Sequence, residues 1–280
     1  MAATWRLVIE YDGSAFSGWQ RQPNDPSVQA TLEDALGRLF SVPRVITHAS
    51  GRTDAGVHAL GQVVSFRAEK ERNPEHLRLG LNTVLPPEVS VIEAARAPAG
   101  FHARISAVGK TYRYRILQRR DRSPFHRGYA LHVRTPFDWA ALETGMAALV
   151  GTHDFSAFRG AGCNARSPVR TIHWARHHVA GDEHCLEFHG NGFLRYQVRR
   201  MVGTLVEVGM GKRPPSNVAE VVASRDPRAA GKTALACGLY LVSVDYPPSA
   251  LLFDALAGVE EPGGVADGGG AAADAGRGDE

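Results

Sequence analysis

The segment Gly51–His58, which reads Gly-Arg-Thr-Asp-Ala-Gly-Val-His, sets one carboxylate, Asp54, in a turn bracketed by glycines. Glycine lets the backbone turn sharply, so a short acid can be held rigidly at the end of a strand. A carboxylate placed in this way is suited to catalysis. The alternative is a turn aspartate that bonds only to its own backbone. The octapeptide alone leaves both interpretations open.

A second candidate segment interleaves aromatic rings with cations in Lys110-Thr111-Tyr112-Arg113-Tyr114. A nucleobase can stack on a tyrosine while neighbouring cations hold phosphates, a combination typical of RNA-binding proteins. The alternative is a strand whose aromatic face packs into the core while its arginines are solvated.

The charge distribution also favours a polyanionic partner. The chain has 280 residues and a net charge of +3, but residues 257–280 carry six acids and one base, so residues 1–256 carry the remaining +8. Nine bases and a single acid lie between Arg104 and Arg134. Such clustering favours nucleic acid as the partner, with a solvated basic face as the alternative.

Two adjacent arginines, Arg199 and Arg200, fall in a segment that otherwise has the apolar spacing of a helix. An arginine that enters a core-facing helix usually has an anionic partner, because an unpaired buried charge is costly. Asp54 is the candidate partner. The alternative is that both arginines face solvent.

Other kinds of site find little support in the sequence. The histidines between His173 and His189 lack metal-ligand spacing, and neighbours on a hairpin point to opposite faces, so we expect no metal. The glycine-rich segment 12–18 carries neither nucleotide-binding fingerprint, and no Gly-x-Ser-x-Gly elbow occurs. Without a long apolar run, a secretory signal or an even set of cysteines, we expect a cytoplasmic protein with no membrane segment.

Alternating and helical patterns follow one another without a regular strand–helix–strand order. Strands are expected near 5–11, 45–49, 62–66, 89–94, 110–117, 171–180, 184–189 and 239–244. Helices are expected near 28–39, 74–84, 139–149 and 193–210. We therefore predict an α+β fold with a mostly antiparallel sheet. The Gly/Ala-rich acidic tail, 257–280, is expected to be disordered.

Taken together, these segments resemble tRNA pseudouridine synthases of the TruA family over roughly residues 4–247. The resemblance includes the Asp54 turn with the Phe193–Gly203 segment, which are highly specific in combination. Five further motifs contribute: Tyr11-Asp12-Gly13 with Gly18-Trp19-Gln20-Arg21-Gln22, Phe101-His102-Ala103-Arg104, Tyr112-Arg113-Tyr114, Gly151-Thr152-His153-Asp154-Phe155, and Gly238-Leu239-Tyr240-Leu241.

The resemblance implies an enzyme that isomerises uridine to pseudouridine at positions 38 to 40 in the anticodon arm of tRNA. It implies a homodimer without metal or organic cofactor, in which two similar α+β halves, 1–107 and 108–250, flank a central cleft. Asp54 would be the catalytic aspartate and Arg199 its basic partner. Tyr112 would act in catalysis and stack on the target base. Arg52 would help to displace that base, and Leu239 would pack beneath the site. We also expect Arg104 and Arg113 to contact the RNA.

Two positions bear on these assignments. Gln197 stands where the family usually has a methionine, which indicates a change in packing. Arg200 directly follows Arg199, so the sequence leaves open which of the two pairs with Asp54. Two rival functions remain as well: an RNA-binding protein without catalytic activity, and a zinc hydrolase built on the histidine cluster.

Overall fold

A single open sheet is the central element of the computed structural model, which describes residues 2–251. The path through the sheet runs β4-β1-β3-β10-β5-β9-β8-β7, with β2 beside β3 and β6 beside β5. Within the described residues only the β10–β3 and β5–β6 pairs are parallel. The predicted α+β class with a mostly antiparallel sheet is therefore confirmed.

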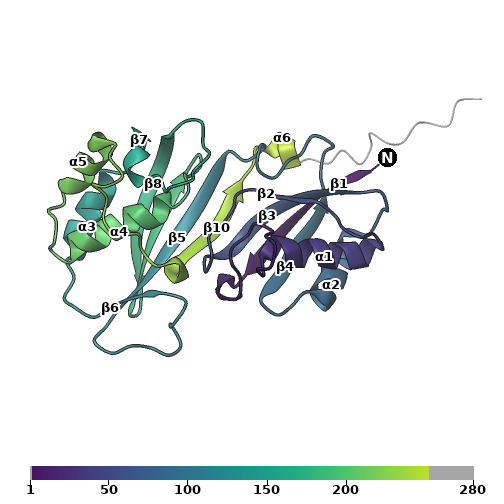
Figure 1. Ribbon diagram of the computed structural model, residues 1–280, viewed down its shortest axis with the longest axis horizontal. Coiled ribbons are helices and arrows are strands. Elements are labelled where there is room, and N and C mark those ends of the chain that lie inside the picture. The colour runs from purple at the N-terminus through teal and green to yellow at the C-terminus, as the bar shows by residue number, and fades with distance from the viewer. Residues whose placement is uncertain (1, 252–280) are drawn as a thin grey trace, which may run out of the picture.

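The strands are β1 (Ala3–Tyr11), β2 (Thr47–Ala49), β3 (His58–Ala68), β4 (Val89–Arg96), β5 (Gly109–Gln118), β6 (Leu131–Val133), β7 (Gly151–Asp154), β8 (Val169–Ala180), β9 (Glu183–Gly190) and β10 (Leu239–Asp245). The helices are α1 (Val28–Phe40), α2 (Pro74–Val84), α3 (Trp139–Ala147), α4 (Gln197–Gly209), α5 (Asn217–Ser224) and α6 (Pro248–Leu251). Figure 1 shows α1 and α2 over one end of the sheet and α3, α4 and α5 over the other.

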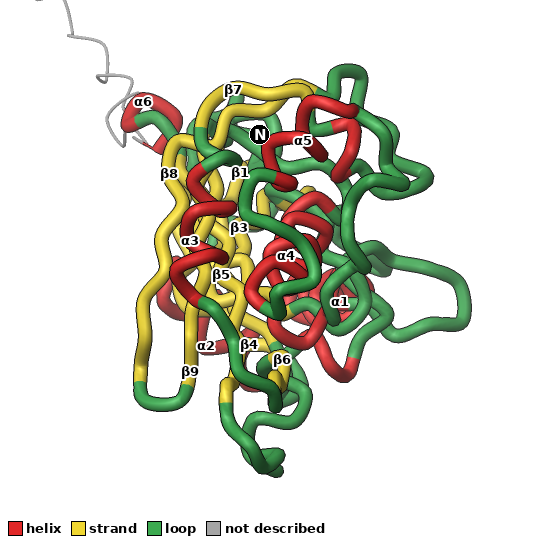
Figure 2. The backbone as a smooth tube through the Cα atoms, turned by 90° about the vertical axis from the view of Figure 1, so that its left-hand side faces the viewer, coloured by secondary structure: helices red, strands yellow, loops and turns green. Residues whose placement is uncertain are grey.

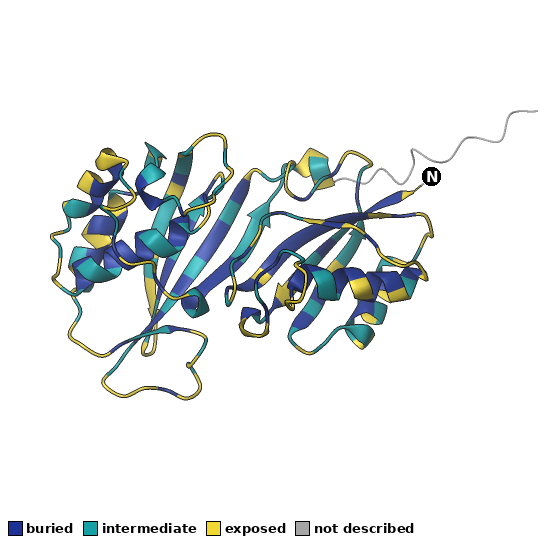
Figure 3. Cartoon of the chain, viewed as in Figure 1, coloured by how far each residue is buried: buried dark blue, intermediate teal, exposed yellow. Residues whose placement is uncertain are grey.

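The main core lies between one face of the sheet and these helices. Trp5, Leu7 and Ile9 alternate into it from β1, as the sequence pattern predicts. The inner sides of α1 and α4 close it, and α1 and α4 lie on the same side of the strands (Figure 2). Buried residues concentrate along the central strands in both halves (Figure 3). A smaller cluster around Phe101 and Tyr246 covers part of the opposite face.

Strand β10 joins the two ends of the sheet. It comes from the end of the described chain, yet it pairs with β3 on one side and β5 on the other. The strands on the two sides of β10 therefore form one continuous sheet. The division of the chain at residue 107 stays a prediction, and the predicted tail, 257–280, lies outside the described residues.

The predicted elements are all present, with some differences in extent. The predicted helix 193–210 begins only at Gln197, because Tyr196 has a left-handed backbone (φ 63°) that a helix cannot include. Strand β3 is longer than predicted, since it begins at His58 directly after the Asp54 turn. The short elements β6, β7, α5 and α6 were not predicted, because too few residues repeat in each to show a period.

Candidate active site

The turn that carries Asp54 joins β2 to β3 and is held by hydrogen bonds from three other segments. The hydroxyl groups of Tyr11 and Thr53 lie 2.8 Å apart. The Trp19 backbone N–H donates to the Thr53 carbonyl over 3.1 Å. From β3, the Gln62 side chain accepts from the Ser50 hydroxyl and donates to the Gly51 carbonyl. The turn is therefore fixed on both sides of Asp54.

The glycine-rich segment at 12–18 packs directly against this turn. A Cβ atom on Gly13 would lie 2.0 Å from the Val57 carbonyl oxygen, and one on Gly18 would lie 2.9 Å from that of Thr53. Gly18 also has a φ of 102°, a conformation that favours glycine. These glycines therefore serve the close approach of two backbone segments.

Arg199 reaches the same place from α4. Its Nη1 donates to Oδ2 of Asp54 over 3.2 Å, and its Nε donates to the Ala234 carbonyl over 2.8 Å. The bond to Ala234 orients the guanidinium. Ala234 belongs to segment 231–234, which packs so closely on α4 that a Cβ on Gly203 would lie 1.7 Å from the Lys232 oxygen. Within the described chain, the Asp54 carboxylate accepts no backbone hydrogen bond, so the interpretation as a self-bonded turn aspartate does not hold.

Arg200 points elsewhere, although it follows Arg199 directly. Its Nη2 donates to the carbonyls of Ala157 and Pro227. Successive residues on a helix are about 100° apart, so only one of the two arginines can face the turn. The structure therefore brings Arg199 to Asp54, and the ambiguity between the two arginines is resolved.

The electrostatics of Asp54 combine two opposing effects. Burial raises the pKa of the carboxyl above its ordinary value of 3.8, and the nearby guanidinium groups of Arg199 and Arg195 lower it in part. The net pKa shift is upward, so Arg199 limits the cost of burying the charge and does not reverse it. The side chain remains 24% exposed, which leaves the carboxylate accessible to a substrate.

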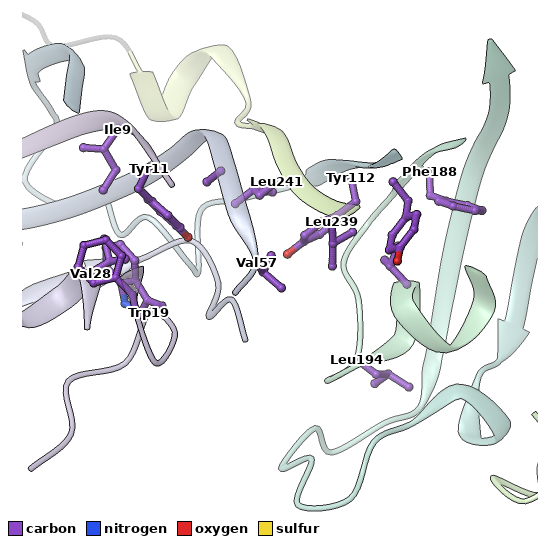
Figure 4. Close-up of a cluster of buried hydrophobic side chains, with 14 of the residues drawn as sticks. Ile9, Tyr11, Trp19, Val28, Val57, Tyr112, Phe188, Leu194, Leu239 and Leu241 are labelled. Carbon is purple, nitrogen blue, oxygen red and sulfur yellow. The ribbon is translucent and has the colours of Figure 1, made fainter. Parts of the chain in front are cut away.

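Tyr112 lies on the face of β5 that looks toward this pair. Its ring meets that of Phe193 edge to face at 5.2 Å, and its strand neighbour on β10 is Leu241. Figure 4 shows Tyr112 and Leu239 beside Val57, which ends the Asp54 turn. Tyr112 is only 8% exposed, so it is far less open than an exposed stacking surface. Burial, with smaller contributions from Tyr11 and Asp54, raises the pKa of the hydroxyl far above 10.0, so this group stays protonated at neutral pH.

The three other predicted RNA-contacting arginines differ in position. Arg52, in the Asp54 turn, is exposed and makes no hydrogen bond or ion pair with residues 2–251. Arg104 is also exposed, in the loop before β5. Arg113 lies on the face of β5 opposite Tyr112, where its Nε donates to Glu187 over 2.8 Å. The structure therefore does not bring Arg113 to the site, because successive strand residues alternate between faces.

The histidine cluster on β8 and β9 forms ring contacts and hydrogen bonds. His177 lies 2.6 Å from the Glu143 carboxylate through Nδ1 and 2.9 Å from His184 through Nε2. The His184 ring stacks on Trp139 at 3.6 Å. In the part of the chain that the structure describes, no three His, Cys, Asp or Glu side chains converge in a metal-binding arrangement. No described helix is long and apolar enough to cross a membrane.

Some residues around the site were not foreseen. Gln62 is fully buried within an apolar strand, and a buried polar side chain in such a run was the available signal. Lys110 donates from Nζ to the Ser50 carbonyl over 2.7 Å, next to the Asp54 turn. Gln197, expected as a packing change, is buried and accepts from the Leu194 N–H over 2.8 Å, so it fixes the backbone before α4.

Comparison with known proteins agrees with this arrangement. The family model described as tRNA pseudouridine synthase matches residues 7–104 and 146–247, which include Asp54 and Arg199 respectively. The chain therefore belongs to the tRNA pseudouridine synthase family.

Several relatives carry the name tRNA pseudouridine synthase A. The protein from Methylobacterium nodulans is 47% identical over 88% of this chain and 97% of its own length. The relative from Syntrophotalea carbinolica is 46% identical over 87% and 96%. The relative from Myxococcus xanthus is 44% identical over 94% and 96%. The similarity thus extends over both halves of the sheet.

The opposing effects on Asp54 lead to a measurable prediction. Arg199→Met should raise the pKa of Asp54 further above its already raised value, because a neighbouring cation favours the ionised form. Carbon-detected NMR titration of the Asp54 carboxyl measures this pKa. Arg200→Met is the matched control and should leave the pKa unchanged. An equal shift in both variants would contradict the assignment of Arg199.

Proposed function

We propose that this protein converts uridine to pseudouridine in tRNA, with Asp54 as its catalytic carboxylate. The observation that carries the proposal is the contact between Asp54 and Arg199, which are 145 residues apart in the sequence. A protein that only binds RNA has no use for an acid held among cations, since a carboxylate repels phosphates. The membership of the chain in the tRNA pseudouridine synthase family agrees with this assignment.

The residue types suit the chemistry of the isomerisation. The N1–C1′ bond of the uridine breaks, the base reorients, C5 bonds to C1′, and the proton lost from C5 is balanced by one gained at N1. Bond cleavage develops positive charge on the sugar, which an ionised carboxylate can stabilise or attack. Attack on the sugar, attack on the base and removal of a sugar proton all require the ionised form of Asp54. Arg199 supports each route by favouring that form.

The target uridine has to leave the helical stack before it can react. Extrusion of a base costs a few kcal/mol, and contacts to the enzyme offset this cost. We assign Arg52 to the gap left by the base, because its guanidinium is exposed beside Asp54 and has no partner within residues 2–251. Tyr112 provides the aromatic surface for the base, and Leu239 packs beneath it. The edge-to-face contact with Phe193 holds the Tyr112 ring in place, so a base that stacks on the accessible part of Tyr112 meets a rigid surface.

We extend the proposal to the substrate and the assembly. The resemblance to TruA enzymes supports uridines 38 to 40 in the anticodon arm as targets and a homodimer as the active form. One anticodon arm is more extended than a single small site, which favours a surface shared by two subunits. Sedimentation at micromolar concentration should give twice the mass of the chain. A monomer that modifies tRNA would contradict the dimer.

The two halves of the chain have separate tasks in this account. The half at 1–107 carries Asp54 and Arg52, and the half at 108–250 carries Tyr112, Arg199 and Leu239. Arg104 remains a candidate for phosphate binding, whereas Arg113 is omitted because Glu187 engages it on the other face. We place the protein in the cytoplasm, since it acts on tRNA and its three cysteines are free thiols.

Asp54→Asn tests the catalytic role of the carboxylate. The amide keeps the volume but cannot ionise, so pseudouridine formation should fall by on the order of 10³-fold or more while tRNA binding is retained. Pseudouridine mapping on unmodified tRNA measures product and position together. Asp25→Asn, at an exposed position, is the matched control.

The outcomes separate the proposed enzyme from an RNA-binding protein. Product at positions 38 to 40 with wild-type protein and none with Asp54→Asn supports the proposal. Full activity in Asp54→Asn would reject the role of Asp54. Tight tRNA binding without any product from wild-type protein would favour the RNA-binding protein without catalytic activity.

The protonated hydroxyl of Tyr112 leads to a separate prediction. Because burial raises the pKa of Tyr112 far above neutrality, its ring rather than a phenolate should support catalysis. Tyr112→Phe should keep activity within about tenfold of wild type, and Tyr112→Leu should lose on the order of 100-fold, since base stacking contributes about 1–3 kcal/mol. Single-turnover rates on unmodified tRNA distinguish them. Equal loss in both variants would assign an essential role to the hydroxyl.

A further inference from the structure

Lys110 is a cation beside the active-site turn that the proposed chemistry does not use. It lies on β5 two residues before Tyr112, so both side chains leave the same face of the strand. Its Nζ donates to the Ser50 carbonyl over 2.7 Å, and a Cβ on Gly51 would lie 2.8 Å from that nitrogen. Lys110 thus ties the strand that carries Tyr112 to the turn that carries Asp54.

Lys110 has no carboxylate partner among the described residues. Within residues 2–251 neither Lys110, Arg104 nor Arg170 forms an ion pair with a carboxylate. Burial, with smaller contributions from the charges of Arg104 and Arg170, lowers the pKa of Lys110 to about 8. Three cations without a counterion repel one another, and a bound anion would relieve that repulsion. An ammonium has three donors, and only one is engaged by Ser50.

Arg170 lies near the aromatic residues of the site. Its Nε lies 3.9 Å from the place of a Cβ on Gly192, the residue before Phe193. Phe193 in turn packs on Tyr112. Lys110 and Arg170 therefore border the space next to Asp54 and Tyr112, where the strand around an extruded uridine has to pass. Arg104 is exposed and close enough for its charge to act on Lys110.

We propose that Lys110, with Arg104 and Arg170, binds a phosphodiester of the RNA strand beside the target uridine and thereby positions the Asp54 turn. This inference rests on the proposed function, because it assumes an RNA substrate at Asp54. A phosphate held by Lys110 fixes the Lys110–Ser50 bond in place, and Ser50 belongs to the turn. Lys110 acts in this way as a positioning residue, since it reaches the reacting carboxylate only through the backbone.

Other groups near Lys110 that titrate or carry charge have to be separated from it in a test. The turn contributes Arg52 and Asp54. On the opposite face of β5, His189 lies 3.5 Å from Asp245. Around Arg170, nearby Arg159 helps to lower the pKa of the Cys163 thiol below 9.0. A Lys110→Arg variant retains all of these groups, so its comparison with wild type isolates the titration of Lys110.

The binding test uses unmodified tRNA in the Asp54→Asn background, which prevents turnover. Above about pH 8 free Lys110 is neutral and must take up a proton to bind phosphate, so affinity should fall about tenfold between pH 7 and pH 9. Lys110→Arg, whose guanidinium does not titrate in this range, should change less than twofold. The same tenfold fall in Lys110→Arg would overturn the inference.

Salt dependence provides a second readout that a structural role would not change. Lys110→Met should weaken binding at least tenfold and lower the slope of log K against log salt by about 1, because one phosphate contact is lost. Lys70→Met, at an exposed position, is the control and should keep the slope. An unchanged slope in folded Lys110→Met overturns the inference. If circular dichroism shows that this variant is unfolded, the pH comparison with Lys110→Arg decides.

A turnover measurement tests the positioning role and separates this inference from the proposed function. At saturating tRNA, Lys110→Met in the otherwise wild-type chain should lower kcat at least tenfold, whereas Lys110→Arg should restore most of it. If the wild-type protein forms pseudouridine but Lys110→Met leaves the salt slope unchanged, this inference is overturned and the proposed function stands. Absence of product from wild-type protein would contradict the proposed function instead.

Discussion

The ion pair between Asp54 and Arg199 is the interaction on which the arrangement of the molecule depends. Burial penalises the carboxylate, and a guanidinium at 3.2 Å offsets part of that penalty. The acid belongs to the turn before β3, whereas the arginine belongs to α4, which covers the part of the sheet on the other side of β10 (Figure 1). β10 brings the two segments together, because it pairs with β3 on one side and with β5 on the other and so connects the two parts of the sheet.

The precision of this contact comes from backbone packing on both sides. Gly13 and Gly18 let the segment after β1 lie against the Asp54 turn. Gly203 lets α4 lie against segment 231–234, whose Ala234 carbonyl orients the Arg199 guanidinium. A side chain at these glycines would separate the backbones and move the acid or the arginine. The glycines therefore help to set the geometry of the proposed catalytic site even though they carry no reactive group.

Much of this could be predicted from the sequence, since local patterns determine it. The alternation in β1 and β5, the turn at Asp54 and the helical spacing of α4 are all local. The choice between Arg199 and Arg200 could not be predicted, because it depends on the phase of α4 relative to a distant turn. The position of β10 was also hidden, since its neighbours lie far away in the chain. Strand alternation does place Arg113 on the other face of β5 from Tyr112, so this separation follows from the sequence pattern alone.

In the proposed reaction, Asp54 acts on an extruded uridine while Arg199 holds the carboxylate in place. A structure of the Asp54→Asn protein with unmodified tRNA tests this most directly. We predict that the glycosidic bond of the target uridine lies against residue 54, with the base on Tyr112 and Arg199 still beside the turn. A uridine that remains in its helical stack, or that binds away from residue 54, would contradict the account.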